Sequence, residues 1–141
     1  MLRSFFRLFV TLHVRIYRLT GGKLGGRVPG MRVLLITTSG RKSGRERTTP
    51  LGFFQHDGGY VVVASNGGSD VHPAWFLNLQ STPRAVVQVG PERFEAAAEV
   101  IGPLQRGPLW ARLIEIAPAY DRYTSKTHRE IPLVILRPTG D

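Results

Sequence analysis

The sequence predicts a small antiparallel β-barrel with added helices, built as one domain made mainly of strands. The length of 141 residues leaves room for one hydrophobic core of useful size. Apolar residues make up 42% of the chain and charged residues 21%, a balance that favours a packed globular protein over a disordered one. About six short apolar runs are separated by turn residues, mostly in hairpin order, which is typical of a small barrel.

Residues 1–19 predict an amphipathic helix. At about 100° per residue, the four arginines of this segment fall within an arc of roughly 120°, and only Val14 interrupts their side of the helix. A basic face opposite Phe and Leu is typical of a helix in a membrane interface, while packing on the domain itself or on a dimer partner are open alternatives. The Gly-rich residues 21–30 predict a flexible linker. We therefore divide the chain into residues 1–26, helix and linker, and residues 27–141, the barrel domain.

The remaining elements follow from short apolar runs and their turns. Residues 31–38 are apolar and rich in β-branched side chains, which predicts a buried strand. The turn sequence 56–59 joins the next two predicted strands, and Gly90-Pro91 joins the two after them. Pro73 can begin a helix at its first turn, and Pro118 ends another. The predicted strands are residues 31–38, 47–55, 60–65, 85–89, 93–101 and 131–136, and the helices between them are residues 73–79 and 108–116.

The positive charge is concentrated in the first third of the chain. Residues 1–50 hold eleven Lys and Arg against one acidic residue, a net charge of +10, whereas residues 51–141 carry a net charge of −1. This asymmetry indicates an anionic partner: nucleic acid, anionic lipid or a small molecule that bears phosphate. The basic turn at residues 39–50 lacks the interleaved aromatic residues that stack on bases, so we expect no nucleic-acid partner.

Several chemistries have no support in the sequence. The chain has no cysteine, which excludes disulfides, a thiol nucleophile and every Cys-ligated metal site. The four histidines lack metal-ligand spacing, and neither a dinucleotide fingerprint, a phosphate-binding loop nor a G-x-S-x-G elbow occurs, so no metal site is predicted. No run of 18 apolar residues and no signal-peptide pattern is present. We expect a cytoplasmic protein that could contact the inner face of the cell membrane through residues 1–19.

The polar turn 39–50 is the first segment that could carry chemistry. It holds four cations, Arg41, Lys42, Arg45 and Arg47, together with hydroxyl groups and glycines between two predicted strands. Arginine offers forked donors, lysine a point charge, and glycine a backbone that a ligand can approach closely. The turn therefore suits a phosphate or carboxylate group.

Two further segments combine polar loops with aromatic residues. A strand end at Ala64 leads through a small polar loop into a helix that begins with Trp75 and Phe76, and such a loop can present N–H groups to an anionic or heteroaromatic ligand. Because neighbours on a helix point about 100° apart, one of the two aromatic residues is expected in the core. Tyr120 and Tyr123 stand at helical spacing and could supply a hydroxyl donor or an aromatic wall.

Four sequence blocks, taken together and in order, carry a family resemblance. The chain resembles the deazaflavin-dependent nitroreductases of actinobacteria, also described as quinone reductases that use coenzyme F420, over roughly residues 30–137. The resemblance implies a split β-barrel of the flavin-reductase-like type. The blocks are T-T-S-G-R-K-S-G-R-E-R-T-T-P-L (37–51), V-V-V-A-S-N-G-G (61–68), H-P-A-W-F-L-N-L (72–79), and A-Y-D-R-Y (119–123) with I-P-L (131–133).

The resemblance also implies which residues bind the coenzyme. The turn residues would grip its phosphate and acidic tail, and the following strand would lie along tail and ring. The second strand end would lie beside the deazaflavin, and the helix start would also line the coenzyme. Tyr120 would lie at the reactive face. The implied coenzyme-binding residues are Arg41, Lys42, Ser43, Arg47, Thr48, Thr49, Pro50, Leu51, Gly52, Val63, Ala64, Ser65, Asn66, Ala74, Trp75, Phe76, Leu77, Asn78 and Tyr120.

The implied reaction is hydride transfer from reduced F420 to a quinone, nitro compound or other small electron-poor acceptor. Tyr120, with Ser65, would orient the acceptor or donate a hydrogen bond to it, and Tyr123 and Ala117 would line its pocket. Gly52, Asn66 and Ala117 stand where the best-known nitroreductase member has an aromatic residue, a lysine and a tyrosine. The alternatives are an FMN-dependent oxidoreductase on the same barrel and a non-enzymatic binder of anionic membranes or nucleic acid. The protein is expected to be a monomer or a homodimer.

Overall fold

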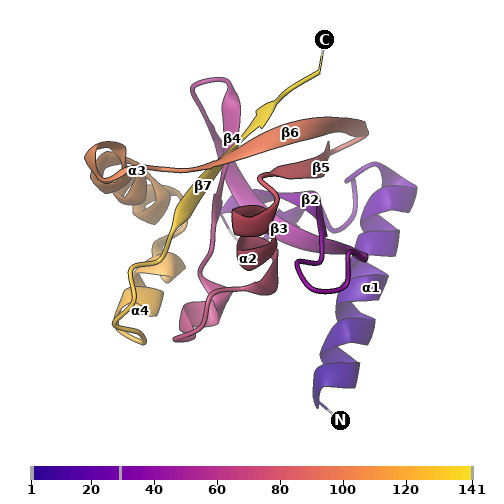
Figure 1. Ribbon diagram of the computed structural model, residues 1–141, viewed down its shortest axis with the longest axis horizontal. Coiled ribbons are helices and arrows are strands. Elements are labelled where there is room, and N and C mark those ends of the chain that lie inside the picture. The colour runs from indigo at the N-terminus through magenta and orange to yellow at the C-terminus, as the bar shows by residue number, and fades with distance from the viewer. Residues whose placement is uncertain (1, 29, 141) are drawn as a thin grey trace.

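Six antiparallel strands close into a barrel in the computed structural model, which describes residues 2–28 and 30–140 (Figure 1). The strands are β2 (Met31–Ser39), β3 (Glu46–His56), β4 (Gly59–Val63), β5 (Arg84–Val89), β6 (Glu92–Val100) and β7 (Leu133–Pro138). Their order is β2-β3-β4-β7-β6-β5, and the pairing of β2 with β5 closes the barrel. The predicted barrel class is confirmed.

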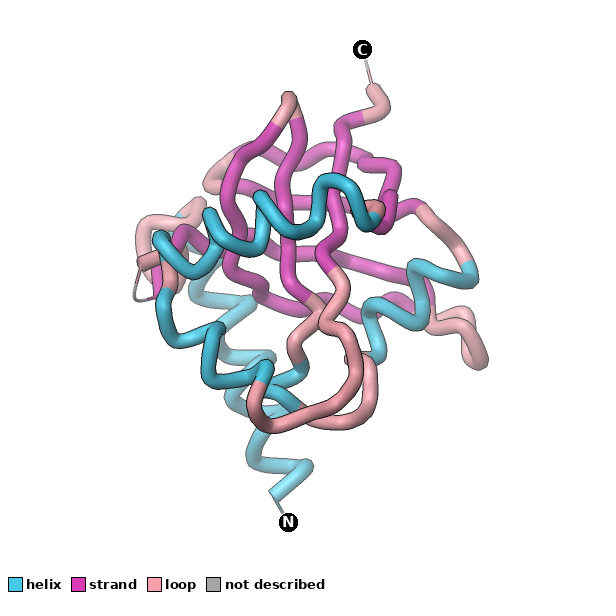
Figure 2. Tube along the Cα trace, turned by 90° about the vertical axis from the view of Figure 1, so that its left-hand side faces the viewer, coloured by secondary structure: helices cyan, strands magenta, loops and turns pink. Residues whose placement is uncertain are grey.

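The helices lie around this barrel (Figure 2). In Figure 1, α3 and α4 are seen on the left and α1 on the right. The helices are α1 (Leu2–Thr20), α2 (Ala74–Ser81), α3 (Pro103–Ile116) and α4 (Asp121–Thr124), with short 3₁₀ turns at Asn66–Gly68 and Pro118–Tyr120.

The core follows from alternation along the strands. On β2, Leu34 and Ile36 point into the barrel, whereas Val33 and Leu35 point outward to a separate cluster beneath α1. Strand β4 is buried on both faces, because Val62 faces the interior and Val61 packs outward in the cluster that also holds residues of α3. This double burial explains why β4 reads as a continuous apolar run and not as an alternating one.

Helix α1 packs on the barrel through a narrow stripe. Val14 and Tyr17 are 7% and 1% exposed and contact Val33 and Leu35. The Tyr17 hydroxyl lies 2.9 Å from the Val33 carbonyl oxygen and accepts a hydrogen bond from the Gly90 N–H at 2.8 Å. The predicted helix is confirmed, and Val14, the apolar residue on its basic side, belongs to the stripe that meets the barrel. The division of the chain at residue 26 stays a prediction.

Two predicted segments need correction. Helix α3 begins at Pro103, not at residue 108, because Pro103 already occupies the first turn, where no N–H is required, and the helix continues through Pro108. The segment predicted as a flexible linker contains strand β1 (Arg27–Val28), which pairs with the start of β2. The Gly26 carbonyl also accepts a hydrogen bond from the Val33 N–H at 2.8 Å, so backbone pairing orders the end of this segment.

Candidate functional site

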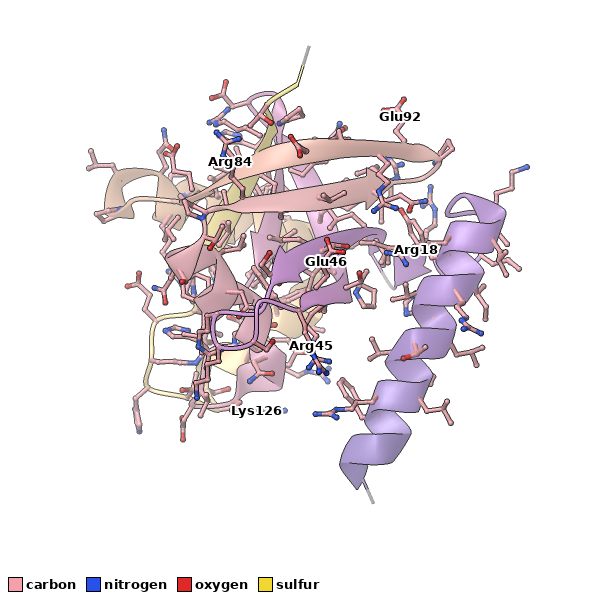
Figure 3. The ribbon with its side chains drawn as sticks, turned by 45° about the vertical axis from the view of Figure 1, so that its right-hand side comes forward. Arg18, Arg45, Glu46, Arg84, Glu92 and Lys126 are labelled. Atoms are coloured by element: carbon pink, nitrogen blue, oxygen red, sulfur yellow. The ribbon has the colours of Figure 1, made fainter. Side chains whose placement is uncertain are left out.

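The loop between β2 and β3 is a closed turn that carries exposed cations. The Gly40 N–H donates to the Arg45 carbonyl at 2.8 Å, and the Gly44 N–H donates to the Gly40 carbonyl at 2.8 Å. Gly44 has φ = 71°, a conformation that favours glycine. These bonds hold the backbone in a compact ring. Arg41, Lys42 and Arg45 are exposed to solvent, and Arg45 is labelled in Figure 3.

Asn78 on α2 anchors this loop to the barrel. Its side chain is 4% exposed, and its Oδ1 accepts a hydrogen bond from the Arg41 N–H at 3.1 Å. Its Nδ2 donates to Thr38 Oγ1 at 3.1 Å. A buried amide with both ends paired is stabilising, whereas an unpaired one is costly. The structure therefore joins α2 to the basic loop through Asn78.

Among the residues that the structure describes, no acidic side chain forms an ion pair with the cations of the loop. In residues 2–28 and 30–140 the ion pairs are Arg106 with Glu130 at 3.4 Å and Arg137 with Asp57 at 3.3 Å, both away from this loop. Arg18 of α1 adds a cation from another element near this loop, where it donates to Thr48 Oγ1 at 3.2 Å. Several like charges without counter-ions create a positive potential that an anionic group would relieve. The loop is thus suited to bind a polyanion.

Strand β3 runs from this loop to Tyr120. A Cβ atom at Gly52 would lie 3.5 Å from Tyr120 Oη and 3.1 Å from Met31 Sδ, so the glycine leaves bare backbone beside the phenol. Thr48 and Gly52 are four residues apart on the strand, about 13 Å at roughly 3.3 Å per residue. The site therefore has a cationic end and a phenolic end joined by one strand, which suits a ligand with an anionic tail and a ring.

Tyr120 and Tyr123 form the phenolic end. Their rings stand edge to face, with centroids 5.4 Å apart and an interplanar angle of 88°. Burial, and then the neighbouring Tyr123, raise the pKa of the Tyr120 hydroxyl, so this group stays protonated and can donate a hydrogen bond. Ala117 is 4% exposed and accepts a hydrogen bond on its carbonyl from the Tyr120 N–H at 3.1 Å.

The loop after β4 lies beside these tyrosines. A Cβ atom at Gly68 would lie 3.3 Å from the Cα atom of Tyr123, which places the 3₁₀ turn 66–68 against α4. Arg129 holds the same loop through the carbonyl oxygens of Ser65 and Ser69, at 2.8 Å each. No local sequence pattern indicates a role for Arg129, because its partners are about sixty residues away in the chain.

Some implied coenzyme-binding residues are buried inside the protein. Trp75 and Phe76 are 6% and 3% exposed and pack in the barrel interior, so both belong to the core, where only one was expected. Ala64 is fully buried and Val63 nearly so. Helix α2 therefore reaches the basic loop through Asn78, and the loop after β4 approaches Tyr123 at Gly68.

Comparisons with known proteins agree with this geometry. Residues 9–138 match the family model described as F420H(2)-dependent quinone reductase. The chain is 40% identical over 131 residues to an F420H(2)-dependent quinone reductase of Mycobacterium tuberculosis (strain ATCC 25618 / H37Rv), which covers 89% of this chain and 87% of that protein.

Two solved structures are similar over most of the chain. One, an F420-H2 dependent reductase, is 36% identical with a TM-score of 0.67, over 74% of this chain and 93% of that one. The other, described as a domain-swapped dimer, is 31% identical with a TM-score of 0.70, over 97% of this chain and 100% of that one. The split-barrel fold and the family resemblance are both confirmed. The chain belongs to the F420H(2)-dependent quinone reductase family.

Proposed function

We propose that this protein transfers a hydride from reduced coenzyme F420 to a quinone or a similar electron-poor acceptor. The observation that carries the proposal is the strip along β3, which joins unpaired cations at one end to Gly52 and Tyr120 at the other. Bound reduced F420 supplies the hydride, so the protein needs neither a covalent nucleophile nor a metal. The chain's own task is to bind the coenzyme and orient the acceptor.

The cationic end would hold the coenzyme's phosphate and acidic tail. Arg41 and Lys42 project from the turn, and Arg47 follows at the start of β3. Ser43 and the half-buried Thr48 add hydroxyl groups along the same path, whereas Thr49 points to the opposite face of β3. Hydrogen bonds between cations and phosphate or carboxylate oxygens are among the stronger ones in proteins.

The phenolic end would orient the acceptor. A hydride that adds to a quinone leaves negative charge on a carbonyl oxygen, and the protonated Tyr120 hydroxyl can donate a hydrogen bond to that oxygen as the charge develops. Ser65 provides a second hydroxyl at the neighbouring strand end. Tyr123 and Ala117 line the acceptor side, and Gly52 keeps the space beside Tyr120 free.

A fluorescence titration of the purified protein with F420, with FMN in parallel, tests the coenzyme. We expect saturable binding of the deazaflavin and reoxidation of reduced F420 when a soluble quinone is added. Binding of FMN alone would indicate an FMN-dependent oxidoreductase with the same barrel fold. Binding of neither would reject the proposal and leave a non-enzymatic binder of anions.

We also propose that α1 lies on the inner face of the cell membrane. No helix within residues 2–28 and 30–140 is long and apolar enough to span a membrane. The outward side of α1 nevertheless exposes Phe9 at 67%, Leu12 at 55% and Leu19 at 86%, beside the basic Arg15. An amphipathic helix of this kind binds anionic lipid surfaces through apolar insertion and charge. A lipophilic quinone would then be within reach of the site.

Co-sedimentation with phosphatidylglycerol vesicles tests this placement, with phosphatidylcholine vesicles for comparison. We expect the protein to sediment with the anionic vesicles, and Phe9→Glu with Leu12→Glu to abolish this. Leu104→Glu is the matched control, because Leu104 is 94% exposed but lies on α3. Equal sedimentation of all three proteins would reject the membrane role of α1.

We propose a homodimer as the assembly in solution. The relative described as a domain-swapped dimer matches this chain over 97% of its length, including α1. Analytical ultracentrifugation over a range of concentrations tests this, and a monomer at every concentration would reject it.

A further inference from the structure

We infer that Arg129 is a positioning residue that sets the Ser65–Gly67 loop against the ring of the bound coenzyme. The inference rests on the function proposed above. Arg129 lies between α4 and β7, outside every block that the sequence analysis assigned to the coenzyme. Its side chain makes four contacts with one loop, the loop that follows β4.

The guanidinium group gathers three carbonyl oxygens of this loop. Its Nη2 donates to Ser65 at 2.8 Å, its Nε to Ser69 at 2.8 Å and its Nη1 to Ala64 at 3.2 Å. Nη1 also lies 3.0 Å from His72 Nδ1, which must be the acceptor because arginine only donates. Arginine suits this position because its fork holds several acceptors at fixed angles, which the point charge of lysine cannot do.

These bonds decide where the N–H groups of the loop point. In a trans peptide the C=O and the following N–H lie in one plane and point in opposite directions. Since the carbonyls of Ala64 and Ser65 point to Arg129, the N–H groups of Ser65 and Asn66 point away from it. Within the described ranges, neither N–H donates a hydrogen bond to another residue.

The backbone angles support the same conclusion. Ser65 has φ = −76° and ψ = −35°, in the right-handed helical region, and Asn66 follows with φ = 47°, in the left-handed one. Successive residues of this kind turn their N–H groups into a concave nest that accepts an oxygen atom. A second hydrogen bond from the same segment also holds the loop, because Thr127 Oγ1 donates to Asp70 Oδ1 at 2.7 Å.

The placement of the loop gives this pair of donors a target. The loop lies beside Tyr123, and Tyr123 packs on Tyr120. The N–H groups of Ser65 and Asn66 would therefore hold a carbonyl oxygen of the deazaflavin ring, while the distant cations hold the tail. Arg129 acts through these backbone groups and does not touch the coenzyme. Its loss should disturb the ring's orientation more than the binding of the tail.

The test compares Arg129→Lys and Arg129→Met with the wild type in steady-state turnover and in F420 titration. We expect kcat to fall about tenfold or more in both variants, because misplacing reacting groups by about 1 Å can cost about a hundredfold. The Kd for F420 should rise about threefold or less, since the basic loop is intact. In the wild type, addition of F420 should shift the ¹H–¹⁵N signals of Ser65 and Asn66, and Arg129→Lys should reduce these shifts.

Arg137→Met is the matched control. Arg137 also holds a turn by donating to a carbonyl, that of Asp57 at 2.7 Å, but this turn joins β3 to β4 away from the site. A purely structural arginine would lower Tm in either variant and leave kcat per folded molecule unchanged. If Arg129→Met does not fold, Arg129→Lys and the rescue of Arg129→Ala by added guanidinium, seen as recovered kcat, decide the matter.

Two results separate the outcomes. Wild-type kcat in Arg129→Lys, with unchanged amide shifts and normal F420 binding, would overturn the positioning role while the proposed function stands. Failure of the wild type itself to bind F420 would reject the proposed function first. An equal loss of kcat in Arg137→Met would also overturn the inference, because it would assign the effect to general stability.

Discussion

Tyr120 joins a half-buried ring to a hydroxyl that stays protonated, because burial raises its pKa. We predict that Tyr120→Phe lowers turnover on the order of tenfold to a hundredfold and changes F420 affinity much less, since the donor acts on charge that develops only in the transition state. Stopped-flow rates of F420 reoxidation and a fluorescence titration check this. Unchanged turnover with several quinones would show that the phenol only packs.

Tyr17 is the residue that ties α1 to the barrel. Its hydroxyl accepts from the Gly90 N–H and lies within hydrogen-bond distance of the Val33 and Gln88 carbonyls. We predict that Tyr17→Phe lowers the free energy of unfolding by about 1–3 kcal/mol, because the buried partners lose a bond they cannot replace. Urea unfolding measures this, with Tyr60→Phe as the control on the barrel. If Tyr17→Phe lowers the free energy of unfolding no more than Tyr60→Phe does, the prediction is contradicted.

His72 makes stability depend on pH. Burial, and then the charge of Arg129, lower the pKa of His72 from its usual 6.5. The unfolded chain therefore binds this proton more readily than the folded one, so stability rises with pH from the folded pKa up to about 6.5 and is lost as the pH falls through that window. We predict a Tm that declines between pH 7.5 and pH 5.5, and a smaller decline in His72→Asn, which keeps an acceptor. Equal declines would refute the assignment.

At the scale of elements, the loop between β2 and β3 works as a unit because Asn78 fixes its backbone. We predict that Arg41→Ala with Lys42→Ala weakens F420 binding strongly, each lost charged contact costing about 1.5–3 kcal/mol. Isothermal titration measures the change. Arg93→Ala with Arg112→Ala on β6 and α3 removes the same charge away from the loop, and an equal effect there would mean that only net charge matters.

Helix α1 shows how one element can serve two surfaces. Its stripe at Val14 and Tyr17 covers the outward side chains of β2, while Phe9 and Leu12 stay exposed on the other side. The sequence alone predicted an amphipathic helix with a basic face opposite an apolar face. The structure places the barrel contact at the edge of the basic face, which leaves the larger apolar face outside.

For the whole molecule, nearly all excess charge lies in the first fifty residues, which hold α1 and the basic loop. We predict that F420 affinity falls steadily as the salt concentration rises, because exposed charges are screened within about 10 Å at 0.1 M ionic strength. The isolated deazaflavin ring, without its anionic tail, should bind with little dependence on salt. Parallel titrations of F420 and of the isolated ring at 50 and 500 mM salt check both expectations. An equal salt dependence of the two affinities would show that the anionic tail does not contribute to binding through charge.

Local patterns were sufficient for most of the elements. Apolar runs and turn residues such as His56–Gly59 predicted the strands within a few residues, because alternation and turn chemistry are properties of neighbouring residues. The predicted start of α3 at residue 108 was wrong, because Pro103 and Pro108 each fit the first turn of a helix and the sequence does not distinguish them. The basic turn and the two tyrosines were also visible as candidates from their composition.

The sequence by itself therefore determined the strand pattern, the charge asymmetry and the residue types that suit an anionic coenzyme. Only the tertiary structure decided which residues meet: β2 closes on β5, Trp75 and Phe76 turn into the core, and Arg129 gathers a loop about sixty residues away. The physical reason is that hydrophobic periodicity and turn preference are local, whereas barrel closure and hydrogen bonds between distant segments depend on the packing of the whole chain.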